Sequence, residues 1–489
     1  MYYWILLKFH ELISLFKIFC LDVILTVLEL ILILTLVICL ILLIFEKGDK
    51  LIVSMTGAGI SIAAAALPYW TVANVPNQTL LPNGINTLLS KIEPSLMFII
   101  IGMTLLVGVT AETGIYELIA IKIIKLSKGN QTRLLLYLSL LSMTFAAFLD
   151  AYMAIIIIGT ITLVSSNILF QEDDIEPINP KPFLLAEALF ANVGGMLTRV
   201  ASPPNLILGA HFNISFLEFT IAMFPVVFLS AIGTFILLKF FFKKDLAIKI
   251  SDKSIAQLMS LDESNVIRDP KLLKRAIFII IATIVGFFLS SIFDYYGIQI
   301  DLGYIALAGG FSAVALVSSE KPDKTLNHIE WSVVFFYAGL LVMVGLVEEA
   351  NLLEPLVYPI ELIFNIDKNL GLASIIVFNF IVSSFLDNIP MAAIMTGVID
   401  GLQTYLGSSV GSVHPMVWAA VIGTNAGGNV TPIASAAGVQ VVQILNREKE
   451  SSRHISFFEF FKIGLIIALI PVIIGILYVI IVARIFYGW

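Results

Sequence analysis

Apolar residues fill this chain in long runs, and polar residues lie mostly in the segments between them. Runs of about 18 or more apolar residues recur along its length, which indicates a polytopic helical membrane protein. The pattern predicts candidate spans at 21–46, 51–71, 94–114, 182–209, 216–242, 276–295, 302–319, 331–349, 415–445 and 456–487.

Two pairs of apolar runs are shorter than the rest. Asp150 separates Leu134–Leu149 from Met153–Ser165, and Asp387 separates a second pair. A full span needs about 20 residues, so we expect two re-entrant helical hairpins, at about 132–166 and 370–405. The alternative is an ordinary bundle in which both hairpins span fully.

The order of these elements predicts a duplicated chain. Residues 1–20 suggest an amphipathic helix at the membrane interface, and residues 21–242 form a first repeat. A polar, basic segment at 243–275 reads as a cytoplasmic linker, and residues 276–489 repeat the plan. With the basic segments placed inside, the two repeats are inverted. Inverted repeats with interrupted helices are typical of secondary transporters.

One motif, N-x-G-G-x-x-T-x-[V/I]-A-S, occurs twice, at Asn192–Ser202 and at Asn425–Ser435. Each copy lies in a candidate span, in the predicted interrupted helices at about 182–209 and 415–445. Glycine lowers the cost of unwinding a helix, and freed carbonyls and half-helix N-termini can hold ions. The candidate binding residues are Asn192, Gly194, Gly195, Thr198, Ser202, Asn425, Gly427, Gly428, Asn429, Thr431 and Ser435.

Close packing of small residues would explain one such copy equally well, but two copies in register favour a binding site. Asp150 and Asp387 stand at the predicted hairpin turns, where a carboxylate usually marks an ion or proton path. Each could instead cap a half-helix or pair with a cation. Asp387-Asn388-Ile389-Pro390 fits a helix start well.

Two charged residues distinguish the first copy. Arg199 could pair with Asp150 or bind an anionic substrate. Glu187, two turns before Gly194, could carry a proton or be the partner of Arg199. The sequence leaves these alternatives open.

Composition and charge exclude several classes of function. Of the 489 residues 59% are hydrophobic and only 13% are charged, with a mean hydropathy of +1.00. No basic tract suggests nucleic-acid binding, and no phosphate-binding loop suggests an ATP motor. The cysteines, Cys20 and Cys39, and five scattered histidines give no disulfide framework or metal cluster. We therefore expect no enzyme and no cofactor.

Several ordered motifs resemble a known family. Glu187 to Asn205, with N-V-G-G and S-P-P-N, is similar to the pattern of the arsenite permease, NhaD-type sodium/proton antiporter and P protein group. That group belongs to the ion transporter superfamily, and citrate and divalent-anion carriers are its relatives. Phe148-Leu149-Asp150, Phe385–Pro390 and Gly427–Thr431 also match. The resemblance covers roughly residues 50–485.

The resemblance implies an elevator-type transporter with a scaffold, a moving transport domain and a homodimeric assembly. It implies ion binding at the hairpins and interrupted helices, with Na⁺ possible at Asp387, Asn388, Asn429 and Thr431. The first copy departs from the family pattern, since Ala151 replaces an asparagine and Ala201-Ser202 replaces Gly-Asp. This departure favours an anionic substrate over a first-repeat sodium site.

The expected function is secondary transport of a small inorganic or organic anion or oxyanion, coupled to H⁺ or Na⁺. The alternatives are an NhaD-type sodium/proton antiporter and a channel-like or receptor protein on the same scaffold. We expect a multi-pass protein of the plasma membrane, with the lipid bilayer and its ion substrate as partners.

Overall fold

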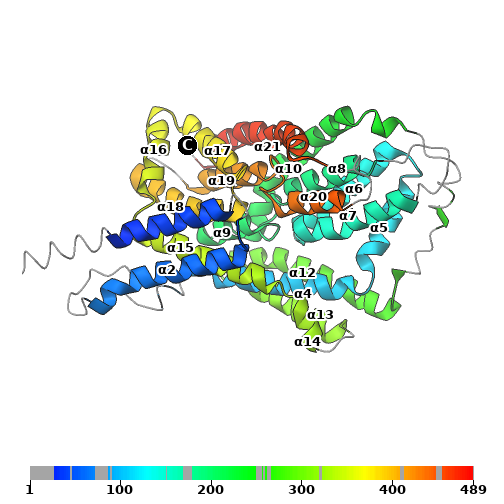
Figure 1. The fold of residues 1–489 in the computed structure, drawn as a ribbon, viewed down its shortest axis with the longest axis horizontal. Helices are drawn as coiled ribbons and strands as arrows, with labels where there is room; N and C mark the ends of the chain where they lie inside the picture. The colour runs from blue at the N-terminus through cyan, green and yellow to red at the C-terminus, as the bar shows by residue number, and fades with distance from the viewer. Residues whose placement is uncertain are drawn as a thin grey trace, which may run out of the picture. The chain divides into compact units, whose positions relative to one another are not determined.

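A computed structural model describes residues 27–43, 47–71, 86, 88, 91–149, 151–168, 179–248, 256, 259–260, 266–318, 322–407, 412–447 and 454–487. These residues form helices joined by loops, with no strand among them (Figure 1). Six described helices are long and apolar enough to cross a membrane. They are α4 (Pro94–Ala111), α6 (Gln131–Phe148), α10 (Phe216–Phe241), α12 (Pro270–Tyr295), α15 (Trp331–Glu349) and α21 (Phe457–Phe486).

The chain divides into two compact units, and the smaller comprises Met1–Glu93 and Phe335–Leu356. It contains the helix Val27–Leu43, α2 (Lys50–Thr71) and most of α15. Gly339 of α15 allows close contact with the backbone of Ser54. An ion pair of 2.8 Å joins Lys91 Nζ to Glu349 Oε2. The predicted interfacial helix at 1–20 lies outside the described residues.

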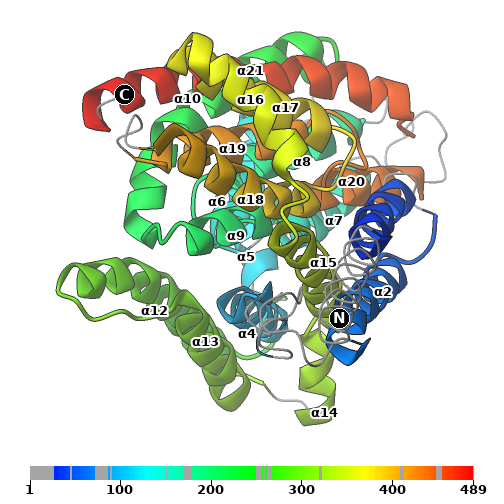
Figure 2. The same ribbon diagram turned by 90° about the vertical axis from the view of Figure 1, so that its left-hand side faces the viewer.

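The larger unit holds the remaining helices, including both hairpins and both interrupted helices. Within it, α4, α12 and α13 (Leu302–Leu316) pack side by side (Figure 2). Gly102 of α4 lies against the backbone of Ala306 on α13, so the helices approach too closely for a larger side chain. Two further helices, α5 (Ile115–Leu126) and α16 (Glu354–Ile366), precede the two hairpins. The short segments are α14 (Pro322–Thr325) and the 3₁₀ turns at Asp245–Ala247 and Leu326–His328.

The first hairpin consists of α6 and α7 (Ala151–Ile168), and the second of α17 (Lys368–Ser383) and α18 (Asn388–Leu406). Both helices of the first hairpin have 18 residues and so exceed the predicted apolar runs. In α6 the extra length comes from polar residues at its start, where Asn130 Oδ1 accepts a bond of 3.0 Å from Arg133 N–H. In α7 it comes from both ends of the helix. Each helix thus reaches the lower limit of a full span.

Asp367 begins the second hairpin as the N-cap of α17. Its carboxylate accepts backbone N–H bonds from Leu370 at 3.1 Å and Asn369 at 2.8 Å. These bonds stabilise the ionised form, so they hold the pKa of Asp367 below its ordinary value.

Both repeated motifs interrupt a helix, at matching positions. The first helix ends as α8 (Lys181–Gly194) and resumes as α9 (Pro203–His211). The second ends as α19 (His414–Gly427) and resumes as α20 (Ala436–Asn446). Both first halves have 14 residues, and their capping glycines have φ −57° in each case. Both second halves begin after a serine in extended conformation, with φ −152° and −144°.

Each hairpin packs on both interrupted helices. Its first helix contacts the first half of the nearer interrupted helix, so α6 lies on α8 and α17 lies on α19. Its second helix also contacts the second half of the other one, so α7 lies on α20 and α18 lies on α9 (Figure 1). The two repeats are therefore joined through the second helix of each hairpin and through the interrupted helices.

Backbone contacts bring hairpin and interrupted helix together. A Cβ atom at Gly194 would collide with the carbonyl oxygen of Met143 on α6, and one at Gly427 would collide with that of Phe380 on α17. Met143 and Phe380 each lie seven residues before the aspartate of their hairpin turn. Glycine at these positions is thus required by packing in both repeats.

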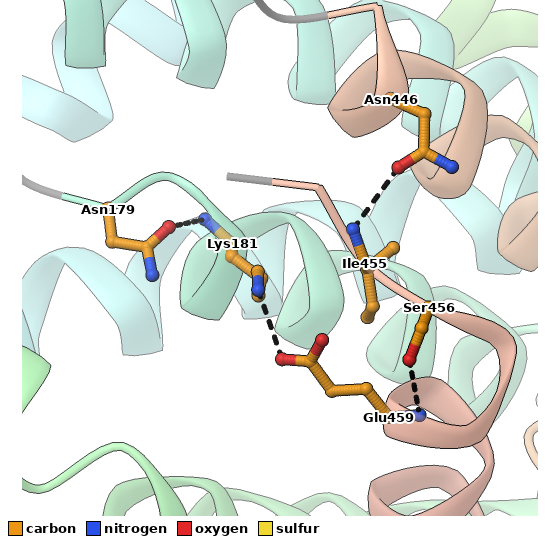
Figure 3. Close-up of polar contacts among 6 residues, drawn as sticks. All are labelled: Asn179, Lys181, Asn446, Ile455, Ser456 and Glu459. Carbon is orange, nitrogen blue, oxygen red and sulfur yellow. Dashed lines mark hydrogen bonds and ion pairs between the residues drawn. The ribbon is translucent and has the colours of Figure 1, made fainter. Parts of the chain in front are cut away.

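Polar contacts fix the outer ends of the interrupted helices (Figure 3). Lys181, the first residue of α8, pairs through Nζ with Glu459 Oε1 of α21 at 3.0 Å. Asn446, the last residue of α20, accepts a bond of 3.1 Å from Ile455 N–H. Ser456 caps α21 by accepting from Glu459 N–H at 3.2 Å. The start of α21 therefore holds both the beginning of α8 and the end of α20.

Substitution of Gly194 by alanine tests the backbone contact. We expect Gly194→Ala to destabilise the protein by about 1–3 kcal/mol, because the methyl group would have to push α6 away from α8. Gly59→Ala is the matched control, since Gly59 also lies in a helix but no atom lies within 4 Å of its Cβ position. The measurement is the unfolding temperature of purified protein in detergent. Equal unfolding temperatures for the two variants would contradict this account of α6–α8 packing.

Candidate functional site

The first repeat reaches into the second through Asn192. Its side-chain Nδ2 donates to the carbonyl oxygen of Gly428 at 3.1 Å, to Asn429 Oδ1 at 2.9 Å and to Ser435 Oγ at 3.0 Å. Asn192 lies near the end of α8, and its three acceptors all lie between α19 and α20. One amide group thus satisfies polar atoms that the second interruption exposes.

The second repeat makes the reciprocal contact through Asn425 of α19. Its Nδ2 donates to Asn205 Oδ1 at 2.9 Å and to the carbonyl oxygen of Val421 at 2.9 Å. Its Oδ1 accepts from Ser202 Oγ at 3.3 Å. In each repeat, therefore, the motif asparagine bonds to the N-cap serine of the other repeat.

Asn205 completes the first interruption. Its Nδ2 donates to the carbonyl oxygens of Gly195 at 2.7 Å and Thr198 at 2.8 Å, inside the loop between α8 and α9. We did not predict this residue as part of the site. Its place directly after Pro203-Pro204, at the start of a half-helix, was the available signal.

The motif threonines fasten each loop to its own hairpin. Thr198 Oγ1 donates to the carbonyl oxygen of Ala147, and Thr431 Oγ1 donates to that of Ser384, both at 2.6 Å. Ala147 and Ser384 each lie three residues before the aspartate of the hairpin turn. The two loops are therefore held by equivalent bonds.

The turn of the second hairpin adjoins this region. Asp387 is the N-cap residue of α18 and is half-buried. The Asn388 amide lies 2.6 Å from Ser383 Oγ. With its NH₂ group turned toward them, it also donates to the carbonyl oxygens of Thr424 and Ala434 at 3.2 Å each. The turn of the first hairpin, Asp150, lies outside the described residues.

Asn429 presents an unsatisfied donor at the centre of the site. The carbonyl of Gly428 can only face the NH₂ group of Asn192, so Asn192 must meet Asn429 at its Oδ1. Asn429 Nδ2 then points elsewhere, and this buried atom has no hydrogen-bond partner among the described residues. A buried donor of this kind is suited to an oxygen atom of a ligand or water.

Three of the four predicted sodium ligands, Asn388, Asn429 and Thr431, make hydrogen bonds to the protein. Thr431 Oγ1 bonds to Ser384, and Asn429 Oδ1 accepts from Asn192. In the described part of the chain, no group of three or more His, Cys, Asp or Glu side chains could hold a metal ion. The Na⁺ site at Asp387, Asn388, Asn429 and Thr431 stays a prediction.

Arg199 contacts residues that follow it in the first repeat. Its Nη1 donates to the carbonyl oxygen of Ile214 at 2.9 Å, and its aliphatic part lies against Gly209 of α9. It forms no ion pair with Glu187, whose carboxylate instead meets Thr162. The alternative in which Glu187 is the ion-pair partner of Arg199 is therefore excluded. The pairing of Arg199 with Asp150 stays a prediction, because Asp150 lies outside the described residues.

Comparisons with known proteins agree with this architecture. The model of the citrate transporter family matches residues 40–423. An uncharacterized transporter of Mycobacterium tuberculosis is 27% identical over 435 residues, covering 88% of this chain and 94% of that protein. The human P protein is 24% identical over 520 residues. The match covers 92% of this chain but only 59% of the P protein.

A solved structure has a similar fold. The YdaH transporter of Alcanivorax borkumensis aligns with a TM-score of 0.56 at 12% sequence identity, covering 90% of this chain and 99% of that chain. These similarities identify a transporter that is an integral membrane protein, and they are consistent with its not being an enzyme. They confirm the resemblance to the ion transporter superfamily.

Two serine variants test the reciprocal contact. Ser435 Oγ both accepts from Asn192 and caps α20 by accepting from Gly438 N–H at 3.2 Å. The hydroxyl of Ser202 makes one longer bond, to Asn425, and does not cap α9. We expect Ser435→Ala to lower stability by about 1 kcal/mol or more, and Ser202→Ala to lower it clearly less.

The measurement is the unfolding temperature of both purified variants, compared with that of the unmodified protein. A larger decrease for Ser202→Ala would show that the capping and amide bonds of Ser435 do not stabilise the interruption.

Proposed function

The chain belongs to the citrate transporter family, and from that membership we propose that it is a secondary active transporter of a small anion or oxyanion, coupled to H⁺ or Na⁺. The family's description makes carboxylates the first class of substrate to test. The anion would bind where the two interrupted helices meet, between Asn192 and Asn425.

The unsatisfied donor of Asn429 is the observation that carries this proposal. A buried N–H group attracts an anionic oxygen and repels a cation. The adjacent half-helices add to this preference, because α9 and α20 begin at Ser202 and Ser435 and present the positive ends of their dipoles there.

The proposed mechanism is an elevator motion of two inverted repeats. The matched interruptions and the equivalent bonds of Thr198 and Thr431 support a duplicated plan. The reciprocal contacts of Asn192 and Asn425 support movement of both hairpins and both interrupted helices together. The group α4, α12 and α13 would serve as the fixed part. A homodimer in the plasma membrane completes the proposal.

An NhaD-type sodium/proton antiporter remains the second candidate. It is favoured by Glu187, a carboxylic acid buried inside the helical unit, because an antiporter must bind a proton during its cycle. Under this alternative, Asp387 and Asn388 would bind Na⁺ and no anion would be carried.

A thermal-stabilisation assay tests the anion site. We expect citrate, or another of a panel containing succinate and phosphate, to raise the unfolding temperature of the purified protein. Asn429→Asp keeps the oxygen that accepts from Asn192 but replaces the donor with a carboxylate oxygen. It should weaken anion binding by about 10-fold or more, since charge-assisted hydrogen bonds contribute about 1.5–3 kcal/mol.

The matched control is Asn446→Asp, an exposed asparagine at the end of α20 whose Oδ1 also accepts a backbone bond. This variant should bind the anion normally. The same proteins in liposomes separate the two candidates. Na⁺-driven proton movement with no anion present, together with no stabilisation by any anion, would contradict the proposal and support the antiporter.

A further inference from the structure

Glu187 is a carboxylic acid in the middle of a helix that is buried on every side. Every residue of α8 except Lys181 is buried, and Glu187 itself is 0% exposed. Its Oε1 accepts a bond of 2.6 Å from Thr162 Oγ1 of α7, and its backbone carbonyl accepts one of 2.9 Å from Ser142 of α6. The second carboxyl oxygen, Oε2, has no hydrogen-bond partner among the described residues.

Among the described residues, no charged group pairs with this carboxyl. Helices α6, α7, α10, α19, α20 and α21 pack on α8. The other titratable side chains of these helices, of α8 and of the loop after α8 are few. They are Arg133 and Tyr137 on α6, Tyr152 on α7, Glu218 and Lys239 on α10, His414 on α19, Glu459, Lys462, Tyr478 and Arg484 on α21, Lys181 on α8 and Arg199 in the loop. None of these makes an ion pair or hydrogen bond with Glu187 in the described part of the chain. An isolated buried carboxylate is strongly unfavourable, so the neutral acid fits this site.

The second repeat shows that the fold does not need this acid. Counting from the motif asparagines, the counterpart of Glu187 is Ala420 on α19. Counting from the hairpin aspartates, the counterpart of Thr162 is Ile399 on α18. Both counterparts are apolar and fully buried. An interrupted helix of the same length therefore forms without the acid and its hydroxyl partner, which points to a functional role in the first repeat.

The acid lies close to the proposed anion site. Glu187 precedes Asn192 by five residues of the same helix, a rise of about 7.5 Å. Through Thr162 it also contacts α7, the second helix of the first hairpin. A change in the protonation of Glu187 can thus act on both α8 and α7, the two helices that border the proposed site.

We propose that Glu187 and Thr162 form a proton-binding site, present in the first repeat alone, that couples transport to the proton gradient. The proton resides on Oε2 in the conformation described here. In a conformation that admits water to Oε2, the O–H bond breaks, the proton passes to water, and the carboxylate left behind keeps its bond from Thr162. This inference rests on the proposed transporter function and names H⁺ as its coupling ion.

The test uses the full chain in liposomes, with radiolabelled citrate as the probe. We expect an imposed pH gradient to accelerate citrate uptake by the unmodified protein. Glu187→Gln should lose this acceleration yet retain citrate–citrate exchange, which needs no net proton movement. Glu361→Gln, which alters another buried glutamate, on α16, should behave like the unmodified protein. Equal acceleration in Glu187→Gln and the unmodified protein would overturn the proposal.

An infrared measurement distinguishes failure of the proton site from failure of the proposed citrate transport. Infrared spectra at neutral pH should show the C=O band of a protonated carboxylic acid that is lost in Glu187→Gln, and persistence of the full band would overturn the proposal without reference to any substrate. If the unmodified protein neither takes up nor exchanges citrate while this band behaves as expected, the fault lies in the proposed citrate transport and not in the proton site.

A second pair of variants covers the case in which Glu187→Gln does not fold. Thr162→Val removes the hydroxyl that stabilises the ionised form, so the midpoint of the pH dependence of uptake should move to higher pH. Thr160→Val is the matched control, because Thr160 is exposed on the same helix and its hydroxyl donates to the backbone carbonyl of Ile156 in that helix. Identical pH profiles for the two variants would overturn the role of Thr162.

Discussion

A helix that stops inside a membrane leaves backbone carbonyl groups without partners, and the bilayer offers none. This constraint governs the centre of the protein. Asn205 satisfies the carbonyls of the first interruption, Asn192 satisfies one of the second, and the motif threonines hold both loops to the hairpins. Of these bonds, that of Asn192 crosses between the repeats, and Asn425 makes the reciprocal crossing bond to Asn205. The reciprocal amide contacts of Asn192 and Asn425 are therefore what joins the two halves into one unit.

The repeats share a frame, meaning the backbone arrangement of the hairpin and the interrupted helix, and they differ in the side chains that this frame carries. Glycines at 194 and 427, threonines at 198 and 431 and serines at 202 and 435 occupy equivalent places. The differences lie beside them: a buried acid with a hydroxyl partner in the first repeat, and polar amides at Asn388 and Asn429 in the second. A duplicated frame can keep its packing while each copy acquires a separate ligand, here proposed as a proton and an anion.

The linear sequence predicts the frame well and the contacts poorly. Glycine pairs and apolar length locate the interruptions, because the backbone consequences of glycine are local. The helices of the first hairpin are longer than predicted because polar residues at their ends, in the first turn of α6 and in the last turn of α7, are absent from any apolar count. The partners of Asn192 and Asn425 lie more than 200 residues away, so no local pattern could identify them. Arg199 is only 15 residues from Ile214, but its bond to that carbonyl depends on the path of the chain through α9, which a local pattern does not show.

The contact between Gly194 and the backbone of Met143 has a mechanical consequence. Side chains between two helices can change rotamer and let the helices slide, but two backbones in direct contact have no such freedom. The helix α6 therefore cannot shift gradually along α8, and Gly427 imposes the same restriction on α17 and α19. In the proposed elevator motion, each hairpin and its interrupted helix would therefore translate as one rigid body, and sliding would occur at the outer surface of the pair.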